Sequence, residues 1–366
     1  MNGIAGLLPG RDDCCGPPSG SGPARAPWWR SSLGRRTGLL CAAYPAAAMA
    51  QISGADYAPL PQPLEFRQVE DAPIWYTIGH PGVPDTANEG NTSNAGFVVT
   101  DEGVVVFDTL GTPSLGWALL QKIRAVTDKP IRFVVLSHYH ADHIYGLQAF
   151  RDHSKAVIVA QAKALDYTAA GNIDDEQAIP RLEQRRAALA PWVNATTRIV
   201  EPGFVFRIAA EIRLGGHMLQ LTYAGPAHSM SDTMMLVLPD QVLFAGDIVQ
   251  NGRIPFMASA AVNTDNWLRG LQEVAEMKPR FIIPGHGQPS ANASEAIAFT
   301  RDYILYVRRA MGEAVSNWTS FDDAYAQADW SPYKDLPAFQ ASNRGNAYRV
   351  FLELENSSFG LAQPSR

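Results

Sequence analysis

The stretch that decides the fold is "SHYHADHIYG", residues 137–146, which directly follows the apolar run "IRFVVL", residues 131–136. An apolar, β-branched run that ends in a polar loop is typical of a buried strand. In α/β proteins, functional side chains gather just beyond the carboxyl ends of such strands. The pattern therefore predicts a metal-binding loop at the edge of a sheet. Within six positions it holds His138, His140, Asp142 and His143, and thus three of the eight histidines of the chain.

Further ligand candidates occur in three later loops, each close behind an apolar run. They are His228 in "AGPAHSMSD", Asp247 in "FAGD" and His286 in "PGHG". Imidazole and carboxylate groups are ligands of zinc, and a catalytic zinc keeps one position open for water. Seven ligands are too many for one tetrahedral ion and suit two. The sequence therefore predicts a two-metal site at which four loops meet.

The spacing of these ligands predicts how they divide between the ions. Two histidines at positions i and i+2 of an extended loop can point the same way, and the Asp-His pair that follows can reach a second ion. We therefore expect one ion to be bound by His138, His140 and His228 and the other by Asp142, His143 and His286, with Asp247 bridging the two. In paired sites of this kind, a bridging hydroxide forms near neutral pH and acts as the nucleophile. Asp142 and Asp247 are thus also expected to be catalytic.

Residues near the ligands have two interpretations each. Asp108 ends the strand "VVVF" and either accepts a hydrogen bond from a ligand histidine or caps the following turn. Arg253, in "GDIVQNGR", either contacts substrate or forms a structural ion pair. Tyr139 and Tyr145 either stabilise an oxyanion or pack, and packing is favoured. No role in the site is expected for the remaining histidines, His80, His153 and His217.

Patterns on both sides of the loop predict two halves, each running from strands into helices. In the first half, strands are expected at 74–78, within the hairpin 96–110, at 129–136 and at 156–160, and a helix at 113–126. The charged segment 174–189 is expected to be a helical surface insertion. In the second half, a β-rich region at 199–246 precedes a helix at 264–277, capped by Thr264 or Asp265, and a strand at 281–287. The two halves suggest two sheets back to back with helices outside.

The order His-x-His-x-Asp-His, lone His, Asp after a strand and final Gly-His-Gly resembles the metallo-β-lactamase superfamily from about Trp75 to Ser290. The resemblance implies an α/β (α+β) fold, an αββα sandwich, here followed by a helical C-terminal extension. It also implies two Zn²⁺ ions at the seven ligands, which accept iron or manganese as well. The implied activity is a metal-dependent hydrolase that cleaves an ester, thioester, lactone or lactam bond of a small molecule.

The branch within the superfamily is predicted from two details. No cysteine follows residue 50, and Asp247 at the bridging position resembles the glyoxalase II and lactonase branches. Together with an export signal predicted at residues 35–50, the C-terminal sequence "GNAYRVFLELE", residues 345–355, makes the chain most similar to the quinoprotein relay system zinc metallohydrolases. Alternative interpretations are a metallo-β-lactamase acting on β-lactam antibiotics and a non-hydrolytic metal-binding accessory of a periplasmic quinoprotein system.

The first fifty residues are typical of a leader with an export signal. Arg35 and Arg36 precede a short apolar stretch that ends in Ala48, Met49 and Ala50, as in signals of the twin-arginine route. This stretch is shorter than the about 20 residues that span a bilayer, so no membrane span is expected after cleavage. We therefore expect a periplasmic or secreted protein. The predicted division is a leader at 1–50, a proline-rich arm at 51–70, the metallo-β-lactamase-fold domain at 71–290 and a helical extension packed on it at 291–366.

Removal of the leader would change the thiol content and the charge. All three cysteines, Cys14, Cys15 and Cys41, lie in it, so the mature protein would have no cysteine ligand or disulfide. The leader holds five of the 30 basic residues and two of the 36 acidic ones, so cleavage would leave 25 against 34 and a net charge of about −9. Proteins that bind nucleic acid usually present a basic surface. A nucleic-acid partner is therefore disfavoured, and no particular protein partner is indicated.

Overall fold

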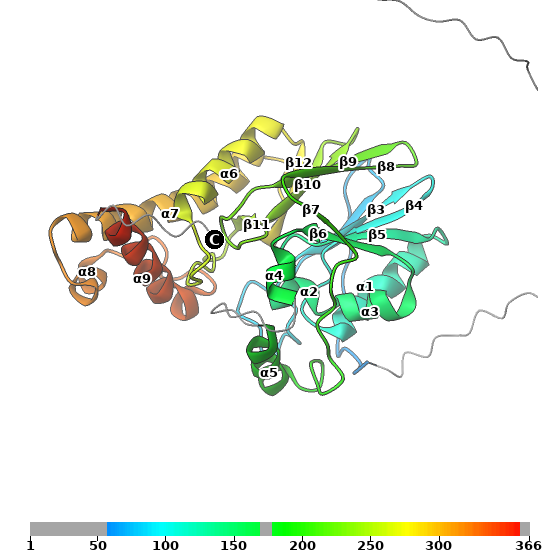
Figure 1. Ribbon diagram of the computed structural model, residues 1–366, viewed down its shortest axis with the longest axis horizontal. Coiled ribbons are helices and arrows are strands. Elements are labelled where there is room, and N and C mark those ends of the chain that lie inside the picture. Colours follow the sequence, from blue (N-terminus) through cyan, green and yellow to red (C-terminus); the bar gives the residue numbers. More distant parts are fainter. Residues whose placement is uncertain (1–56, 169–177, 359–366) are drawn as a thin grey trace, which may run out of the picture. The chain divides into compact units, whose positions relative to one another are not determined.

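The computed structural model describes residues 57–168 and 178–358 (Figure 1). The predicted leader and export signal, the first residues of the predicted arm and the start of the predicted helix at 174–189 lie outside this part of the chain. Among the described helices, none is both long enough and apolar enough to cross a bilayer.

The first sheet contains its strands in their order along the chain: the first lies in the predicted arm at 51–70, the next five lie in the predicted first half, and the last lies in the region 199–246 that was predicted for the second half, so that part of the prediction was wrong. These are β1 (Arg67–Gln68), β2 (Ile74–Thr77), β3 (Ala95–Thr100), β4 (Gly103–Phe107), β5 (Ile131–Val135), β6 (Val157–Gln161) and β7 (Phe204–Phe206). Strands β1 to β4 pair antiparallel, and β4 to β7 pair parallel. The segment after β5 carries the first four ligand candidates, with His138 and His140 in a loop and Asp142 and His143 in the short helix that follows it. All four thus lie at the carboxyl edge of the parallel half, as predicted.

The second sheet has the order β12-β11-β10-β9-β8. Its strands are β8 (Ala209–Leu214), β9 (His217–Tyr223), β10 (Thr233–Leu238), β11 (Val242–Asn251) and β12 (Phe281–Gly287). All neighbours pair antiparallel except β11 and β12, which are parallel. Asp247 lies inside β11, where the pairing with β12 is irregular between Gly246 and Gln250, and His286 is the penultimate residue of β12. Both residues thus lie in strands, and the prediction that they lie in loops was wrong.

One apolar layer lies between the sheets, and helices cover both outer faces (Figure 1). In the inner layer the rings of Phe107 and Phe244 face each other with centroids 5.2 Å apart. The first sheet packs against α1 (Pro113–Val126), α2 (Ala141–Ile144) and α3 (Leu147–His153). The second packs against α6 (Thr264–Met277) and α7 (Ala293–Ser316). The predicted αββα sandwich is therefore confirmed.

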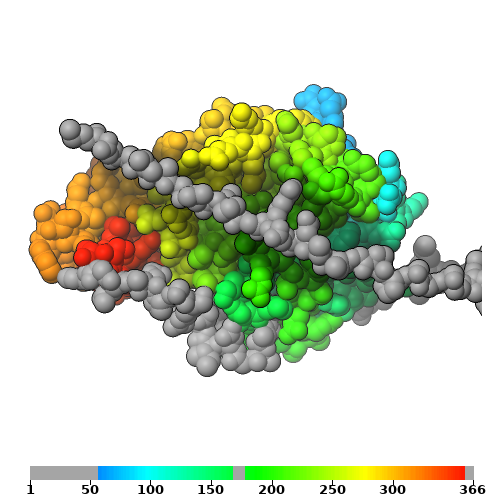
Figure 2. Space-filling model, turned by 45° about the horizontal axis from the view of Figure 1, so that its top comes forward, coloured from blue at the N-terminus to red at the C-terminus, as the bar shows by residue number. Residues whose placement is uncertain are grey.

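The remaining helices lie beside these layers. Helices α4 (Ala164–Thr168) and α5 (Ala178–Leu189) follow β6, and α5 turns the apolar side chains of Leu182 and Leu189 to the core of the first half. Helices α8 (Phe321–Gln327) and α9 (Phe339–Ser358) follow α7 and contact it. In the space-filling view the orange and red surfaces of these C-terminal helices adjoin one another (Figure 2).

Helix α6 begins at Thr264, and its N-cap is Asn263, one residue before the nearer of the two predicted caps. The side chain of Asn263 accepts a hydrogen bond from the backbone N–H of Asn266 at 2.9 Å. The prediction of Thr264 or Asp265 as the cap was wrong, because Thr264 bonds to a carboxylate from a distant helix instead. Both its N–H and its hydroxyl donate to Glu353 of α9, at 2.9 Å each.

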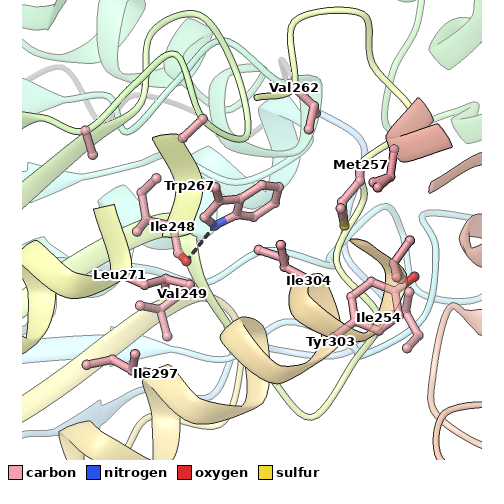
Figure 3. Packing of buried hydrophobic residues seen from close by; sticks show 14 of the residues in the cluster. Ile248, Val249, Ile254, Met257, Val262, Trp267, Leu271, Ile297, Tyr303 and Ile304 are labelled. Atoms are coloured by element: carbon pink, nitrogen blue, oxygen red, sulfur yellow. Dashed lines mark hydrogen bonds between the residues drawn. The ribbon is translucent and has the colours of Figure 1, made fainter. Parts of the chain in front are cut away.

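The ring of Trp267 joins α6 to the strand that carries Asp247. Its Nε1–H donates to the carbonyl oxygen of Ile248 at 2.9 Å, in the apolar cluster between α6, α7 and β11 (Figure 3). One edge of the ring also meets the imidazole of His228, with centroids 5.1 Å apart. Because Trp267 is fully buried, it fixes α6 against β11 and against the loop that carries His228.

We predict that Asn263→Ala lowers the free energy of unfolding by about 1 kcal/mol, because a helix N–H loses its acceptor. Asn263→Asp keeps an acceptor oxygen and should retain most of the stability. Urea denaturation followed by circular dichroism measures both. Equal stability of Asn263→Ala and the parent protein would contradict the assignment of this cap.

Candidate metal centre

Three histidines from two loops bring ring nitrogens to one point. The Nε2 of His138 lies 2.9 Å from the Nδ1 of His140, and the Nε2 of His228 lies 2.8 Å from the same atom. One nitrogen of each ring lies within 4.8 Å of the others. Three converging imidazoles are a typical set of ligands for a divalent transition metal. This set is called the first cluster below.

A second cluster lies beside the first and contains Asp142, His143 and His286. The Oδ2 atom of Asp142 lies 3.8 Å from the Nε2 of His143 and 3.4 Å from the Nε2 of His286. The side chain of Asp142 is 18% exposed, whereas both imidazoles are almost fully buried. Asp142 therefore forms the more open side of the second cluster.

Asp247 connects the two clusters. Its Oδ2 lies 3.2 Å from the Nε2 of both His228 and His286, and its Oδ1 lies 3.3 Å from the Nε2 of His143. One carboxylate thus faces a histidine of the first cluster and two of the second. The structure brings all seven predicted ligands together, in the division expected from their spacing.

The close approach of β12 to β11 depends on glycine. A Cβ atom placed on Gly285 would lie 2.0 Å from the Oδ1 of Asp247 and 2.7 Å from the backbone of Gly246. No other residue would leave space for this carboxylate between the strands. The "PGHG" sequence therefore places His286 and also makes room for Asp247.

Asp108 holds the ring of His143. Its Oδ2 lies 2.8 Å from the Nδ1 of His143, and its Oδ1 accepts the backbone N–H of Ser137 at 2.7 Å. With Nδ1–H donating to Asp108, the Nε2 of His143 is directed at the clusters. Of the two interpretations of Asp108, the structure supports the hydrogen bond to a ligand candidate.

The loop that carries His228 is folded around a buried carboxylate. Asp232 accepts the N–H groups of Ala227 and Ser229 and the hydroxyl of Ser229, at 2.7 to 3.1 Å. Burial raises the pKa of Asp232 to about 6, although the bonds from Ser229 and Ala227 oppose this. These bonds fix the turn that places His228. Asp232 was not predicted from the sequence, because the backbone N–H groups that it accepts lie three and five residues before it, whereas the usual aspartate turn bonds a group two residues further on.

A second set of missed residues precedes β3. The carbonyl oxygen of Thr92 lies 2.6 Å from the Nδ1 of His286, and the hydroxyl of Ser93 donates to the backbone of Asp142. Asn94 donates to the carbonyl oxygens of Pro284 and Gly287, at 2.8 and 2.9 Å. This segment ties the two halves of the sandwich together at the second cluster. Nothing in "NTSN" itself signals this role, because all its partners are distant in sequence.

Arg253 lies against His286. Its Nη1 is 2.8 Å from the Nδ1 of His286, its side chain is almost fully buried, and it forms no ion pair with the described residues. Burial lowers the pKa of Arg253, while the nearby charges of Asp142 and Asp247 act in the opposite direction. A cation on the Nε2 of His286 requires the ring hydrogen on Nδ1, which then donates to Thr92. The guanidinium would be left facing the second cluster.

The other candidates fall outside the clusters. Tyr139 stacks on Tyr167 with centroids 4.7 Å apart, and Tyr145 is fully buried in the core of the first half, which agrees with packing. The remaining histidines belong to no cluster: His80 is exposed, His153 packs on Trp117 and His217 pairs with Asp240.

The electrostatics of His138 and Asp247 suit a bound cation. Burial and the neighbouring His143 lower the pKa of His138 well below its usual value, which favours the neutral, ligating form of the ring. Burial alone would raise the pKa of Asp247, but His286, His143 and His228 outweigh it and keep the carboxylate ionised. The Nε2 of His143 and Oδ1 of Asp247 are buried and have no hydrogen-bond partner among the described residues. A metal ion between them would satisfy both atoms, so the donor set fits the implied metals.

Known proteins resemble this chain over the same region. The family model of the metallo-beta-lactamase superfamily matches residues 89–286. A linear primary-alkylsulfatase of Pseudomonas sp. is 24% identical over 243 residues, which are 58% of this chain and 45% of the relative. A beta-lactamase-like protein 2 homolog of Caenorhabditis elegans is 24% identical over 282 residues, which are 74% of this chain and 81% of the relative.

A solved structure shows the same fold. The stereoselective inverting sec-alkylsulfatase of Pseudomonas sp. superposes with a TM-score of 0.59 at 17% identity, over 82% of this chain and 51% of that one. The chain thus spans about half the length of the two alkylsulfatases that it matches. The family match covers more than half of the chain and includes all seven residues of the clusters. The chain therefore belongs to the metallo-beta-lactamase superfamily of metal-dependent hydrolases.

Proposed function

We propose that this protein is an exported binuclear zinc hydrolase that cleaves an ester, thioester, lactone or lactam bond. The observation that carries the proposal is the pair of clusters joined by Asp247. When bound there, two metal ions supply Lewis acidity and lower the pKa of a coordinated water towards neutrality. The first cluster would hold one ion through three imidazoles, and the second would hold the other through two imidazoles and the carboxylate of Asp142.

The residues of the chain contribute orientation and charge. Asp108 keeps hydrogen on the Nδ1 of His143, and Thr92 selects the same tautomer of His286, so both rings direct Nε2 to the site. Gln250 donates to the Oδ2 of Asp247 at 3.0 Å and limits its rotation. The network is thus arranged before substrate arrives, which reduces reorganisation during the reaction.

The substrate class remains open within this proposal. The relatives include an alkylsulfatase, so a sulfate ester belongs in the test panel beside an ester, a thioester, a lactone and the β-lactam nitrocefin. Loops around the rim of the fold determine which of these bonds is cleaved. Turnover of nitrocefin alone would favour the β-lactamase alternative. Two bound metals without turnover of any panel member would favour a non-hydrolytic accessory.

Export is supported by the sequence "RRTGLLCAAYPAAAMA" at residues 35–50. Fractionation of cells that express the full chain, with and without Arg35→Lys and Arg36→Lys, tests it. Loss of the periplasmic form in the double variant is the expected result. An unchanged distribution would contradict the twin-arginine route.

We predict that His140→Ala loses zinc from the first cluster and lowers kcat/KM by more than about 100-fold, since even residues that only orient ligands contribute 10- to 100-fold. Zinc content by plasma mass spectrometry and turnover of the panel measure the two effects. The exposed His80, replaced by alanine, serves as the control and should leave both unchanged. Full metal content and full activity in His140→Ala would rule out this assignment.

We predict that Asp108→Asn weakens zinc binding by about 10- to 100-fold while the chain stays folded, because the amide keeps the shape but loses the charge that fixes His143. Competition with a chromogenic chelator measures the affinity. Asp101→Asn removes an exposed carboxylate near the same strand and is the matched control. If both variants bind zinc as tightly as the parent protein, Asp108 has no orienting role.

A further inference from the structure

The segment that follows β11 passes the first cluster and presents an aromatic side chain to it. The ring of Phe256 meets the ring of His140 edge to face, with centroids 6.2 Å apart. Phe256 is half-buried, whereas its neighbours Ile254 and Met257 are completely buried in the cluster shown in Figure 3. The backbone on both sides of Phe256 is thus anchored, while the residue, whose ring contacts His140, keeps part of its surface accessible.

A single side chain of α9 binds the backbone on both sides of this ring. The Oδ1 of Asn346 accepts the N–H of Met257 at 2.7 Å, and its Nδ2 donates to the carbonyl oxygen of Pro255 at 2.7 Å. Asn346 is completely buried. The amide of Asn346 thus pairs with the N–H of Met257 and the carbonyl oxygen of Pro255. Replacing Asn346 by an apolar residue would leave both of these backbone groups without their partner.

Other contacts make this support rigid. The Nδ2 of Asn346 also donates to the hydroxyl of Tyr303 in α7, at 2.9 Å. Ile254 donates its N–H to Pro337 at 3.0 Å, and Arg349 of α9 donates to Ala260 at 2.8 Å. The segment beside the first cluster is therefore fixed by α7, by α9 and by the loop before α9. All three lie outside the region matched by the family model, which ends at residue 286.

A partly open aromatic ring beside a polar metal-binding cluster favours an apolar group at that position. Burying such a group against the ring removes apolar surface from water. In a hydrophobic pocket, one methylene changes kcat/KM by about 10- to 200-fold, so a fixed ring can discriminate between substrates by chain length.

We propose that Phe256 is a specificity-determining residue that contacts an apolar acyl group of the substrate next to the bond that is cleaved. Asn346 is the positioning residue that holds it. The inference rests on the proposed hydrolase function and adds the substrate class, an acyl compound with an apolar chain. It also gives the C-terminal helices a part in selectivity.

The test uses the zinc-loaded mature protein with 4-nitrophenyl acetate and 4-nitrophenyl hexanoate. The parent protein should prefer the hexanoyl ester by more than about 10-fold in kcat/KM. Phe256→Ala should bring the ratio close to one, mainly through KM of the longer ester, whereas Phe256→Leu should keep the preference. Phe204→Ala, a half-exposed phenylalanine in β7, is the matched control. An unchanged ratio in Phe256→Ala, or no preference in the parent protein, overturns the proposal.

Two further measurements separate the possible failures. Asn346→Ala should lose the preference while zinc content stays at the parent value; a lower zinc content with an unchanged ratio would contradict a positioning role. If that variant does not fold, the Phe256 variants still decide the main claim. Calorimetric binding of hexanoate against acetate needs no turnover. If the protein hydrolyses no ester but binds hexanoate more tightly than acetate, and Phe256→Ala abolishes this difference, the hydrolase function is refuted and the apolar site is retained. If the parent protein binds hexanoate and acetate equally, the apolar site is refuted as well.

Discussion

The structure depends on the burial of one carboxylate, Asp247, among the imidazoles of His143, His228 and His286. A charged group removed from water is stable only when opposite charge or donors surround it. Here the Nε2 atoms of the three imidazoles lie 3.2 to 3.3 Å from its oxygens, and they come from separate parts of the chain. With the ring hydrogens of His143 and His286 on Nδ1, a cation bound between these nitrogens and the carboxylate would supply the opposite charge. Both sheets have to meet at one edge to provide this environment. The αββα layers are therefore a condition for the site as well as its support.

Polar residues outside the clusters carry this constraint into the rest of the fold. Asp108 and Asp232 each hold a loop that presents a histidine, and Asn94 joins the start of β3 to the end of β12. Such contacts set ring orientation and tautomer, which a metal site needs before an ion arrives. Further from the clusters, Asn346 of α9 holds the backbone on both sides of Phe256 in a similar way. Order in the centre thus depends on hydrogen bonds made at a distance from it.

Much of this was predictable from the sequence, because local patterns report local structure. Alternating and apolar runs predicted the strands, and the helix at 113–126 has the bounds of α1. The seven ligand candidates were recognisable because their motifs are short and lie close to apolar runs, although Asp247 and His286 lie within strands rather than in loops. The cap of α6 was predicted wrongly, since Thr264 is engaged by Glu353, 89 residues away. Thr92, Asn94 and Asn346 were missed for the same reason: their partners are distant in sequence. The branch of the superfamily stays a prediction.

The most direct test of the central claim is X-ray diffraction from crystals of the zinc-loaded protein, recorded on both sides of the zinc absorption edge. The account predicts two anomalous peaks, one among His138, His140 and His228 and one among Asp142, His143 and His286, with Asp247 between them. A single peak, or peaks away from these residues, would contradict it.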